Sequence, residues 1–205
     1  METVARAFPD TALQVTGPNE QTVAFFAESG CSRYAEIGVY EGDTALAVAD
    51  ALAGGGEVHL FDFEDRTQTV ARRLRAAGHA NVVEHPNSRR LLDSYNWSLM
   101  QVLRESDGPA FDYVFLDGAH TWVHDALAFL LVDRLLEPGG YVDFDDYVWT
   151  LRDSPSMNPQ AFPEVRRLYS DEQIVERQVQ LVVELLVRGH GYEEVVANRI
   201  FQKAS

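Results

Sequence analysis

Short apolar runs alternate with helical segments along most of this chain, and this alternation is the feature that most restricts the fold. The runs with strand character cover residues 33–39, 57–63, 80–85, 111–117 and 141–146. The helical segments cover residues 19–29, 43–53, 65–78, 88–105 and 121–136. Strands separated by helices are typical of βαβ units, in which helices cover both faces of a parallel sheet. We therefore predict an α/β, doubly wound fold.

The pattern changes after residue 147. Residues 152–164 contain three of the eight prolines and form part of a 150–170 segment that we expect to be a lid or substrate loop. A helix is predicted over 171–189, and residues 191–205 have the pattern of two strands in a hairpin. The prediction is therefore a mostly parallel seven-stranded sheet that ends in a C-terminal antiparallel hairpin.

Length and charge restrict the class of protein. A chain of 205 residues is expected to be a single domain, 1–205, with residues 1–30 as an N-terminal helical cap. The net charge of −15 argues against nucleic acid and against an anionic membrane as partners. The N-terminus lacks the apolar core of a signal peptide, and the sequence has no run of about 18 apolar residues. We expect a cytoplasmic protein, and the apolar helix near the C-terminus makes a homodimer a candidate.

Ligands of doubly wound sheets bind beyond the carboxyl ends of the strands, so the residues at those ends are the candidate site. These are residues 36–42, Asp62, Asn87 with Ser88, residues 117–120, and Asp145 with Asp146. Most of the charged residues among them are acidic. The sequence therefore predicts a negatively charged edge.

The first strand leads into a glycine-containing turn with the sequence "EIGVYEGDT". Gly38 and Gly42 allow a tight turn and a close approach of backbone to ligand. A pyrophosphate site would have the pattern G-x-G-x-x-G, but Glu41 stands where a phosphate would lie. Asp62, at the end of the second strand, is placed to accept both hydroxyls of a ribose. The turn suits a nucleoside ligand with positive charge and no phosphate.

The pattern Glu36-x-Gly38-x-x-x-Gly42-x-Thr44, followed by Asp62, resembles motif I and the next acidic position of class I S-adenosylmethionine (SAM)-dependent methyltransferases. The resemblance implies a Rossmann-like methyltransferase fold. It implies that Glu36 faces the methionyl ammonium, that Asp62 holds the ribose and that Ser88 lies near adenine. The full cofactor-binding set that we predict is Glu36, Gly38, Tyr40, Gly42, Thr44, Asp62, Ser88 and Asp117.

The stretch "YVDFDDYVW" (141–149) ends an apolar strand in two adjacent carboxylates and contains no Lys or Arg. Asp117 ends the preceding strand, so it can meet Asp145 and Asp146. Carboxylates that converge without basic partners are stabilised by proton sharing, by water or by a divalent cation, and hard oxygen ligands favour Mg²⁺, Ca²⁺ or Mn²⁺. Neighbouring residues of a strand point to opposite faces, so both aspartates can be ligands only if the strand ends before Asp146. Asp143 lies deeper and is expected either to support the ligands from behind or to face a helix.

Residues 33–150 resemble, more narrowly, the metal-dependent O-methyltransferases. The catechol and caffeoyl-CoA enzymes are similar at the acidic segments, and the macrocin and mycinamicin sugar O-methyltransferases are closer, with an Asp-Gly-x-His segment and a later acidic pair. The resemblance implies that Asp117, Asp145 and Asp146 bind Mg²⁺ or another divalent cation and that His120 is the catalytic base. It implies O-methylation of a small hydroxylated metabolite, such as a sugar diol or a phenol. Contact with the substrate is a second possible role for His120, and capping of the next helix or packing are the structural alternatives.

Three other functions remain open at this point. A relative could keep the SAM fold and carry out different chemistry, as in cephalosporin-hydroxylase-like proteins. A non-catalytic small-molecule-binding module would bind SAM, if at all, without a functional metal. An NAD-dependent dehydrogenase is disfavoured by Glu41 and by the missing middle glycine.

Overall fold

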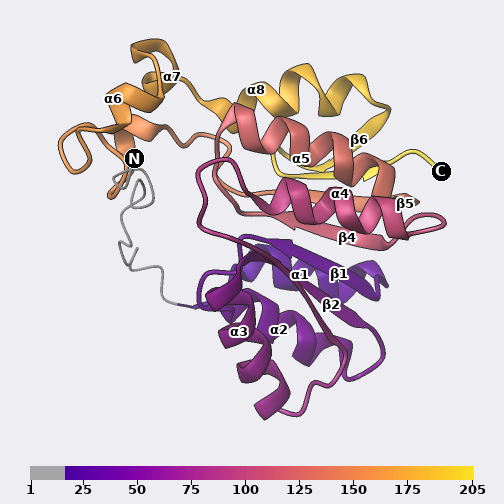
Figure 1. The fold of residues 1–205 in the computed structure, drawn as a ribbon. Helices are drawn as coiled ribbons and strands as arrows, with labels where there is room; N and C mark the ends of the chain where they lie inside the picture. Colours follow the sequence, from indigo (N-terminus) through magenta and orange to yellow (C-terminus); the bar gives the residue numbers. More distant parts are fainter. Residues whose placement is uncertain (1–16) are drawn as a thin grey trace.

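The computed structural model describes residues 17–205 and is built around a seven-stranded sheet (Figure 1). The strand order is β3-β2-β1-β4-β5-β7-β6. The strands are β1 Arg33–Ile37, β2 Glu57–Phe63, β3 Val82–Asn87, β4 Phe111–Leu116, β5 Leu136–Phe144, β6 Tyr192–Val196 and β7 Ile200–Lys203. Strands β1 to β5 are parallel, and the hairpin β6–β7 joins β5 in antiparallel pairing. The predicted fold class is confirmed.

Helices cover both faces of the sheet (Figure 1). The helices are α1 Glu20–Ser29, α2 Asp43–Leu52, α3 Glu64–Ala76, α4 Tyr95–Glu105, α5 Trp122–Leu135, α6 Val165–Leu168, α7 Asp171–Val175 and α8 Gln178–Leu185. Helices α1 to α3 bury apolar side chains against one face, and α4, α5 and α8 do so against the other. Neighbouring strand residues serve opposite faces, as Tyr113 and Val114 do, because side chains alternate along a strand. None of the described helices is long and apolar enough to cross a membrane.

Helix α4 begins seven residues later than predicted. The expected helix over 88–105 starts at Tyr95, where the Ser94 hydroxyl accepts a hydrogen bond from the Asn96 amide. Before it, the Asp93 carboxylate accepts hydrogen bonds from the amide and the hydroxyl of Ser88. A carboxylate that satisfies nearby backbone donors favours a turn over a helix, so these residues form an irregular loop.

The predicted helix over 171–189 is also interrupted. Helix α7 ends at Val175, and α8 begins at Gln178. The buried side-chain amide of Gln178 donates to the Gln173 backbone carbonyl at 2.7 Å and accepts from the Trp122 backbone amide at 2.8 Å. These two hydrogen bonds connect the interruption between α7 and α8 to the start of α5.

The valines of α8 lie in the core of this chain. Val179, Val182 and Val183 are at most 2 % exposed and belong to the same cluster as Phe129 of α5. The apolar character of this helix made a homodimer a candidate, and the structure buries its valines within the chain. A homodimer therefore has no support from these side chains.

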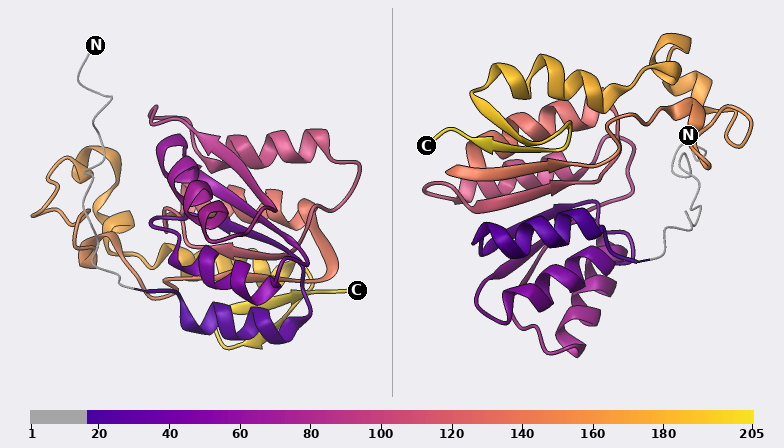
Figure 2. Two further views of the ribbon diagram at one scale, coloured as in Figure 1. Left: turned by 90° about the horizontal axis from the view of Figure 1, so that it is seen from below. Right: turned by 180° about the vertical axis from the view of Figure 1, so that it is seen from behind.

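The 150–170 segment forms a small projection beyond the carboxyl end of β5 (Figure 2). Leu151 and Val165 from this segment pack on Ile174 of α7 in a separate apolar cluster. The placement is compatible with a lid, which stays a prediction. Of the expected N-terminal cap, α1 is present, and residues 1–16 lie outside the described residues.

Candidate functional site

The turn after β1 contains two glycines that no other residue could replace without movement. A Cβ on Gly38, which has φ +91°, would lie 2.0 Å from the Asp117 carbonyl oxygen. A Cβ on Gly42, which has φ +79°, would lie 2.4 Å from Val70 Cγ1 of α3. Both positions combine a left-handed backbone with close contact, so glycine is required there. The turn consequently packs tightly against the ends of β4 and α3.

Asp62 fixes the shape of this turn. One carboxylate oxygen accepts from the amides of Val39, at 3.0 Å, and Tyr40, at 3.3 Å, and the other accepts from Phe63 at 2.6 Å. The side chain is buried, and Arg66 lies 3.6 Å away. Asp62 therefore supports the turn directly, while the predicted contact with a ribose stays a prediction.

Glu36 is a buried carboxyl group at the end of β1. It is 2 % exposed and accepts a 2.7 Å hydrogen bond from the Tyr34 hydroxyl. Burial raises the pKa of Glu36 to about 8, an effect that the Tyr34 bond opposes and the charge of Asp62 reinforces. A cation beside Glu36 would stabilise its charged form. The group is therefore suited to an ammonium ligand.

The end of β3 contributes Asn87, which the sequence placed at the candidate site without a specific partner. Asn87 is buried, and its Oδ1 has no hydrogen-bond partner among the described residues. A buried amide oxygen without a donor is costly, so it is a candidate acceptor for a ligand. Ser88, the residue that we predicted near adenine, is bonded to Asp93. Thr44 accepts a hydrogen bond from the Asn19 amide, which connects the start of α2 to α1.

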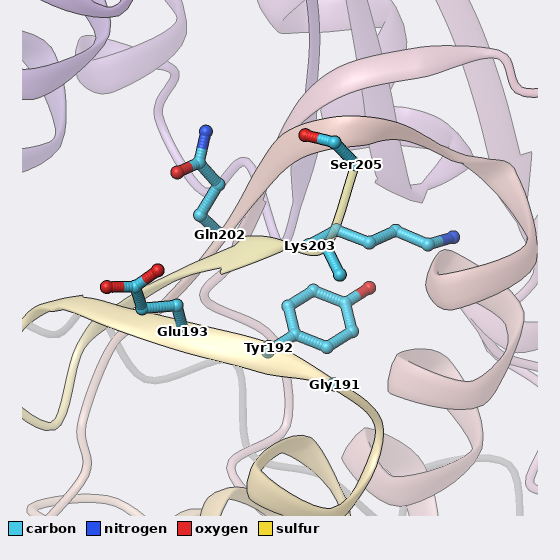
Figure 3. A pocket seen from close by; sticks show the side chains of 7 residues that line it. Gly191, Tyr192, Glu193, Gln202, Lys203 and Ser205 are labelled. Atoms are coloured by element: carbon cyan, nitrogen blue, oxygen red, sulfur yellow. The ribbon is translucent and has the colours of Figure 1, made fainter.

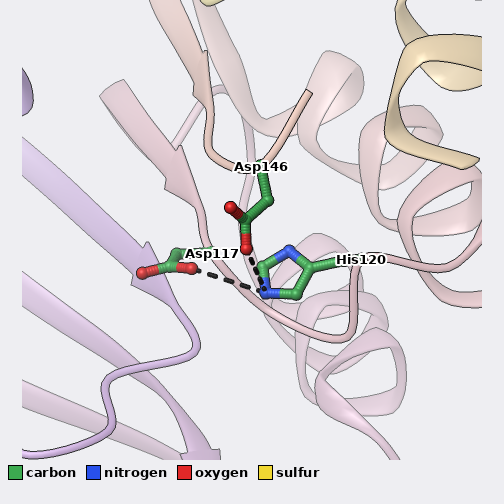
Figure 4. A group of neighbouring side chains, drawn as sticks. All are labelled: Asp117, His120 and Asp146. Atoms are coloured by element: carbon green, nitrogen blue, oxygen red, sulfur yellow. Dashed lines mark ion pairs between the residues drawn. The ribbon is translucent and has the colours of Figure 1, made fainter. Parts of the chain in front are cut away.

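Asp117, His120 and Asp146 meet at the carboxyl ends of β4 and β5 (Figure 4). His120 Nε2 lies 3.6 Å from Asp117 Oδ1 and 3.5 Å from Asp146 Oδ2. Strand β5 ends at Phe144, so the strand does end before Asp146, as the sequence argument required. His120 and Asp146 both have positive φ, at 54° and 58°. Positive φ is uncommon for residues other than glycine and is concentrated at functional sites.

His120 does not cap α5. The N-cap of that helix is Thr121, whose hydroxyl is 2.9 Å from His124 Nδ1. The His120 ring instead lies between the two carboxylates and packs 5.3 Å from the Trp149 ring. His120 therefore does not cap the helix, although it does pack on Trp149, and its role as a base or in substrate contact stays a prediction.

Asp145 forms an ion pair with a basic side chain, Arg199, which was not predicted from the sequence. Arg199 of the β6–β7 hairpin places Nη1 3.1 Å from Asp145 Oδ1 and Nε 3.0 Å from Asp143 Oδ1. The expectation that the acids of this stretch lack basic partners is thus wrong. The partner comes from a hairpin more than 50 residues away in sequence, and its register against β5 is set by tertiary packing.

Asp143 faces helix α1, as predicted. Its fully buried carboxylate accepts from the hydroxyls of Thr22, at 2.7 Å, and Tyr113, at 2.9 Å. Burial raises the pKa of Asp143 to about 6, although Arg199 and the two hydroxyl donors lower it. Asp143 therefore anchors α1 and the hairpin to β5.

Negative charge at this edge exceeds what Arg199 neutralises. The pKa of Asp117 is raised well above its usual range by desolvation and by the charges of Asp145, Glu36 and Asp146. The side chain of Asp117 is nevertheless 35 % accessible. Desolvation also raises the pKa of Asp146, with a further contribution from Asp145. A cation bound here would reverse these effects.

A shallow hollow on the C-terminal hairpin lies away from this edge (Figure 3). Tyr192, Gln202 and Lys203 line it, and Gln202 pairs with Tyr141, well before the carboxyl end of β5. Lys203 Nζ is bonded to the carbonyls of Asp133 and Leu136. The hollow therefore shares no residue with the candidate site.

Comparison with known proteins identifies the family. A family model described as "Methyltransferase domain" matches residues 35–147, which is more than half of the chain and includes both the glycine turn and the acidic edge. The chain belongs to this methyltransferase family. The resemblance to class I methyltransferases inferred from the residues is confirmed.

The methyltransferase also has a curated relative and solved neighbours. It is 27 % identical to tricin synthase 1 of Oryza sativa subsp. japonica over 125 residues, which is 59 % of this chain and 47 % of the relative. The aligned part thus spans about half the length of that relative. The O-methyltransferase from Bacillus cereus, solved in complex with SAH, has a TM-score of 0.61 and 17 % identity over 96 % of this chain and 84 % of its own. SAH-bound PaMTH1 of Podospora anserina has a TM-score of 0.60 and 16 % identity, and the match covers 90 % of this chain and 76 % of PaMTH1. At these identities the two structures confirm the fold.

Proposed function

We propose that this methyltransferase transfers a methyl group from SAM to a hydroxyl of a small metabolite, with a divalent cation at the acidic edge. The observation that carries the proposal is Glu36. It is a buried carboxyl at the end of β1, beside a turn whose glycines bring the chain close to Asp117. A ligand with an ammonium group and no phosphate would satisfy Glu36 and avoid repulsion by Glu41. Family membership and the SAH complex of the Bacillus cereus neighbour support the same cofactor.

The residues of the turn fit the parts of SAM. Glu36 would bind the ammonium group, and Gly38 and Gly42 would let the cofactor approach the backbone. Asp62 would bind the ribose with the lone pairs that the backbone amides leave unused, and Asn87 Oδ1 would accept a hydrogen bond from the adenine amino group. When bound, SAM supplies its methyl group as an electrophile on a positively charged sulfur.

The acidic edge fits a divalent cation. Two carboxylates and one imidazole converge there, and desolvation together with neighbouring carboxylates raises the pKa values of Asp117 and Asp146, an effect that a bound ion would oppose. When bound, such an ion lowers the pKa of an acceptor hydroxyl by several units. From the sequence we expected Mg²⁺ with Asp117, Asp145 and Asp146 as ligands, and His120 as the base. In the structure His120 Nε2 is within 3.6 Å of both neighbouring carboxylates, so it can either accept a proton or bind the ion.

The chain itself orients the acceptor and limits access of water. Trp149 packs on His120, and the 150–170 segment follows it directly beyond the end of β5. An acceptor with two neighbouring oxygens, such as a catechol, a sugar diol or a hydroxy acid, could bind the ion through both. Alignment of its oxygen with the methyl carbon and the sulfur is the main requirement of the reaction. The charge of the chain supports the expectation that nucleic acids and anionic membranes are not partners, and the homodimer stays a prediction.

The decisive experiment is calorimetric titration of SAM into the protein and into Glu36→Gln. We expect one site per chain and at least about tenfold weaker binding in the variant, because a charge-assisted hydrogen bond is worth about 1.5–3 kcal/mol. Glu28→Gln, at an exposed position of α1, is the matched control and should bind as the unaltered protein does. Absence of SAM binding would refute the function.

Methyl transfer is then measured from labelled SAM to catechols, sugar diols and hydroxy acids, with a divalent metal or with EDTA. Transfer that EDTA abolishes supports the full proposal. If EDTA leaves methyl transfer unchanged, the cation has no part in the function. SAM binding without transfer to any acceptor favours the non-catalytic module or different chemistry on the same fold.

A further inference from the structure

We infer that the cation site of this methyltransferase consists of Asp117, His120 and Asp146, with Asp145 excluded by Arg199, and that it prefers Mn²⁺, Fe²⁺, Co²⁺ or Zn²⁺ to Mg²⁺. The inference rests on the proposed function in one respect, the presence of a divalent cation at this edge. It differs from the sequence expectation in one ligand, with an imidazole nitrogen in place of the third carboxylate. That exchange changes both the preferred metal and the role of His120.

Asp145 is already paired with a cationic side chain of the protein. Its Oδ1 accepts from Arg199 Nη1 at 3.1 Å and from Asn19 Nδ2 at 3.4 Å. The backbone amide of Asp145 donates to the Leu116 carbonyl at 3.0 Å, which fixes where the side chain starts. Arginine is permanently charged in proteins, so a metal ion bound to Asp145 would share one carboxylate with a second cation. Repulsion between the two cations disfavours this arrangement.

Arg199 cannot readily release Asp145. The same guanidinium contacts the fully buried Asp143 and donates to Thr22 Oγ1 at 2.9 Å. Movement of Arg199 toward solvent would leave the Asp143 carboxylate buried without its cation, which is strongly unfavourable. The pairing of Asp145 is thus maintained by contacts that have no part in ion binding.

His120 would supply the third ligand in place of Asp145. Its Nε2 is 3.6 Å from Asp117 Oδ1 and 3.5 Å from Asp146 Oδ2, and the three donor atoms lie within 4.8 Å of one another (Figure 4). Metal–ligand bonds of about 2.0–2.2 Å place neighbouring donors roughly 3.0–3.5 Å apart. The two separations from His120 are therefore close to those around a shared ion, while the two carboxylates, whose donor atoms lie within 4.8 Å of each other, could approach further by side-chain rotation.

The donor set determines the preferred metal. Mg²⁺ favours oxygen ligands and retains several waters, whereas imidazole suits Zn²⁺, Fe²⁺ and neighbouring transition metals. Replacing a carboxylate by His120 also removes one negative charge from the ligand set, which weakens binding of a hard cation most. We therefore expect Mn²⁺ to bind more tightly than Mg²⁺, and His120 to act as a ligand and not as the base.

The test is calorimetric titration of Mn²⁺ and of Mg²⁺ into metal-free protein at pH 7.5 without SAM. We expect one Mn²⁺ per chain, bound at least about tenfold more tightly than Mg²⁺. Asp146→Asn and His120→Asn should each weaken Mn²⁺ binding by about tenfold or more, the scale on which metal sites respond to altered ligands. Asparagine tolerates the positive φ of residue 120, so the backbone there is preserved.

Two variants are matched controls. Asp145→Asn should change Mn²⁺ affinity by less than about threefold, since the residue is not a ligand in this site. His124→Asn removes a nearby imidazole that is bonded to Thr121, and it should leave affinity unchanged. A nitrogen coupling in the electron paramagnetic resonance signal of bound Mn²⁺ provides a readout that does not depend on any variant folding.

Three results would overturn the inference: an absence of nitrogen coupling, tighter binding of Mg²⁺, or an Asp145→Asn effect as large as that of Asp146→Asn. In each of these cases SAM binding could still be intact, and the proposed methyltransferase function would stand. If Mn²⁺ binds as described but SAM does not bind, the proposed function fails and the metal assignment remains.

Discussion

Replacing Arg199 by methionine removes the cation beside a fully buried carboxylate and keeps a side chain of similar length. Asp143 is 0 % exposed, and Arg199 Nε lies 3.0 Å from its Oδ1. Thr22 and Tyr113 would still donate to Asp143 in the variant, so its Oδ2 would keep both of its hydrogen bonds. Removing one partner of a buried pair typically costs about 3–5 kcal/mol, because the remaining charge is left without compensation. We expect Arg199→Met to lose unfolding free energy in this range at pH 8.

The loss of unfolding free energy should depend on pH, because Asp143 titrates. Its pKa in the folded protein is about 6, above the ordinary value of 3.8, so the folded state binds the proton more tightly than the unfolded state. Such a group contributes most to stability at low pH, and its contribution falls as pH rises through 6. Without Arg199 the pKa rises further, and each unit adds about 1.4 kcal/mol to the loss at high pH. A rise of about two units corresponds to roughly 3 kcal/mol.

At pH 5 Asp143 is protonated in both folded proteins, so this electrostatic part of the loss disappears. The remainder is the lost packing and hydrogen bonding of Arg199, which we expect to be about 1–2 kcal/mol. The difference between pH 8 and pH 5 is therefore the diagnostic quantity. It separates the loss of charge pairing, to which Asp117 and Asp146 also contribute, from the loss of packing and hydrogen bonding.

The assay is urea unfolding of both proteins at pH 5 and pH 8 in EDTA, followed by circular dichroism. Arg188→Met is the matched control, since Arg188 lies in the same C-terminal region and pairs at 2.7 Å with Glu194 at the surface. A surface ion pair contributes about 0–1 kcal/mol, and this control should lose no more than that at either pH. Equal losses for Arg199→Met at the two pH values, or a loss below 1 kcal/mol at pH 8, would refute the reasoning.

Two further predictions concern the glycine turn. SAM binding at pH 7 should release up to one proton, because Glu36 has a pKa of about 8 in the free protein and a bound ammonium lowers it; calorimetry in buffers of different ionisation enthalpy measures this release, and Glu36→Gln should abolish it. Gly38→Ala should lose more than about 3 kcal/mol of stability in urea, because its Cβ would overlap the Asp117 carbonyl. Gly30→Ala has a similar positive φ but nothing within 4 Å, so it should lose only about 1–2 kcal/mol, and equal losses would show that crowding is unimportant.

Local signals were sufficient where an element is defined by its own residues. The strands ending at Ile37, Phe63 and Leu116 were predicted because apolar runs bounded by glycine or aspartate are a property of the segment itself. Helix boundaries failed where side chains elsewhere compete for the backbone. Asp93 delays the start of α4, and Gln178 separates α7 from α8.

The sequence by itself determined the order of strands and helices, the glycine turn and the acids at the carboxyl ends of the strands. These follow from periodicity and from the rule that parallel strands end at one edge. Only the tertiary structure decided which of these acids is paired with Arg199 and which lie beside His120. Arg199 reaches Asp145 through the pairing of β7 with β5, and His120 reaches Asp146 through a loop with positive φ. Charge pairing depends on distances of a few ångströms between segments remote in sequence, and no spacing along the chain encodes them.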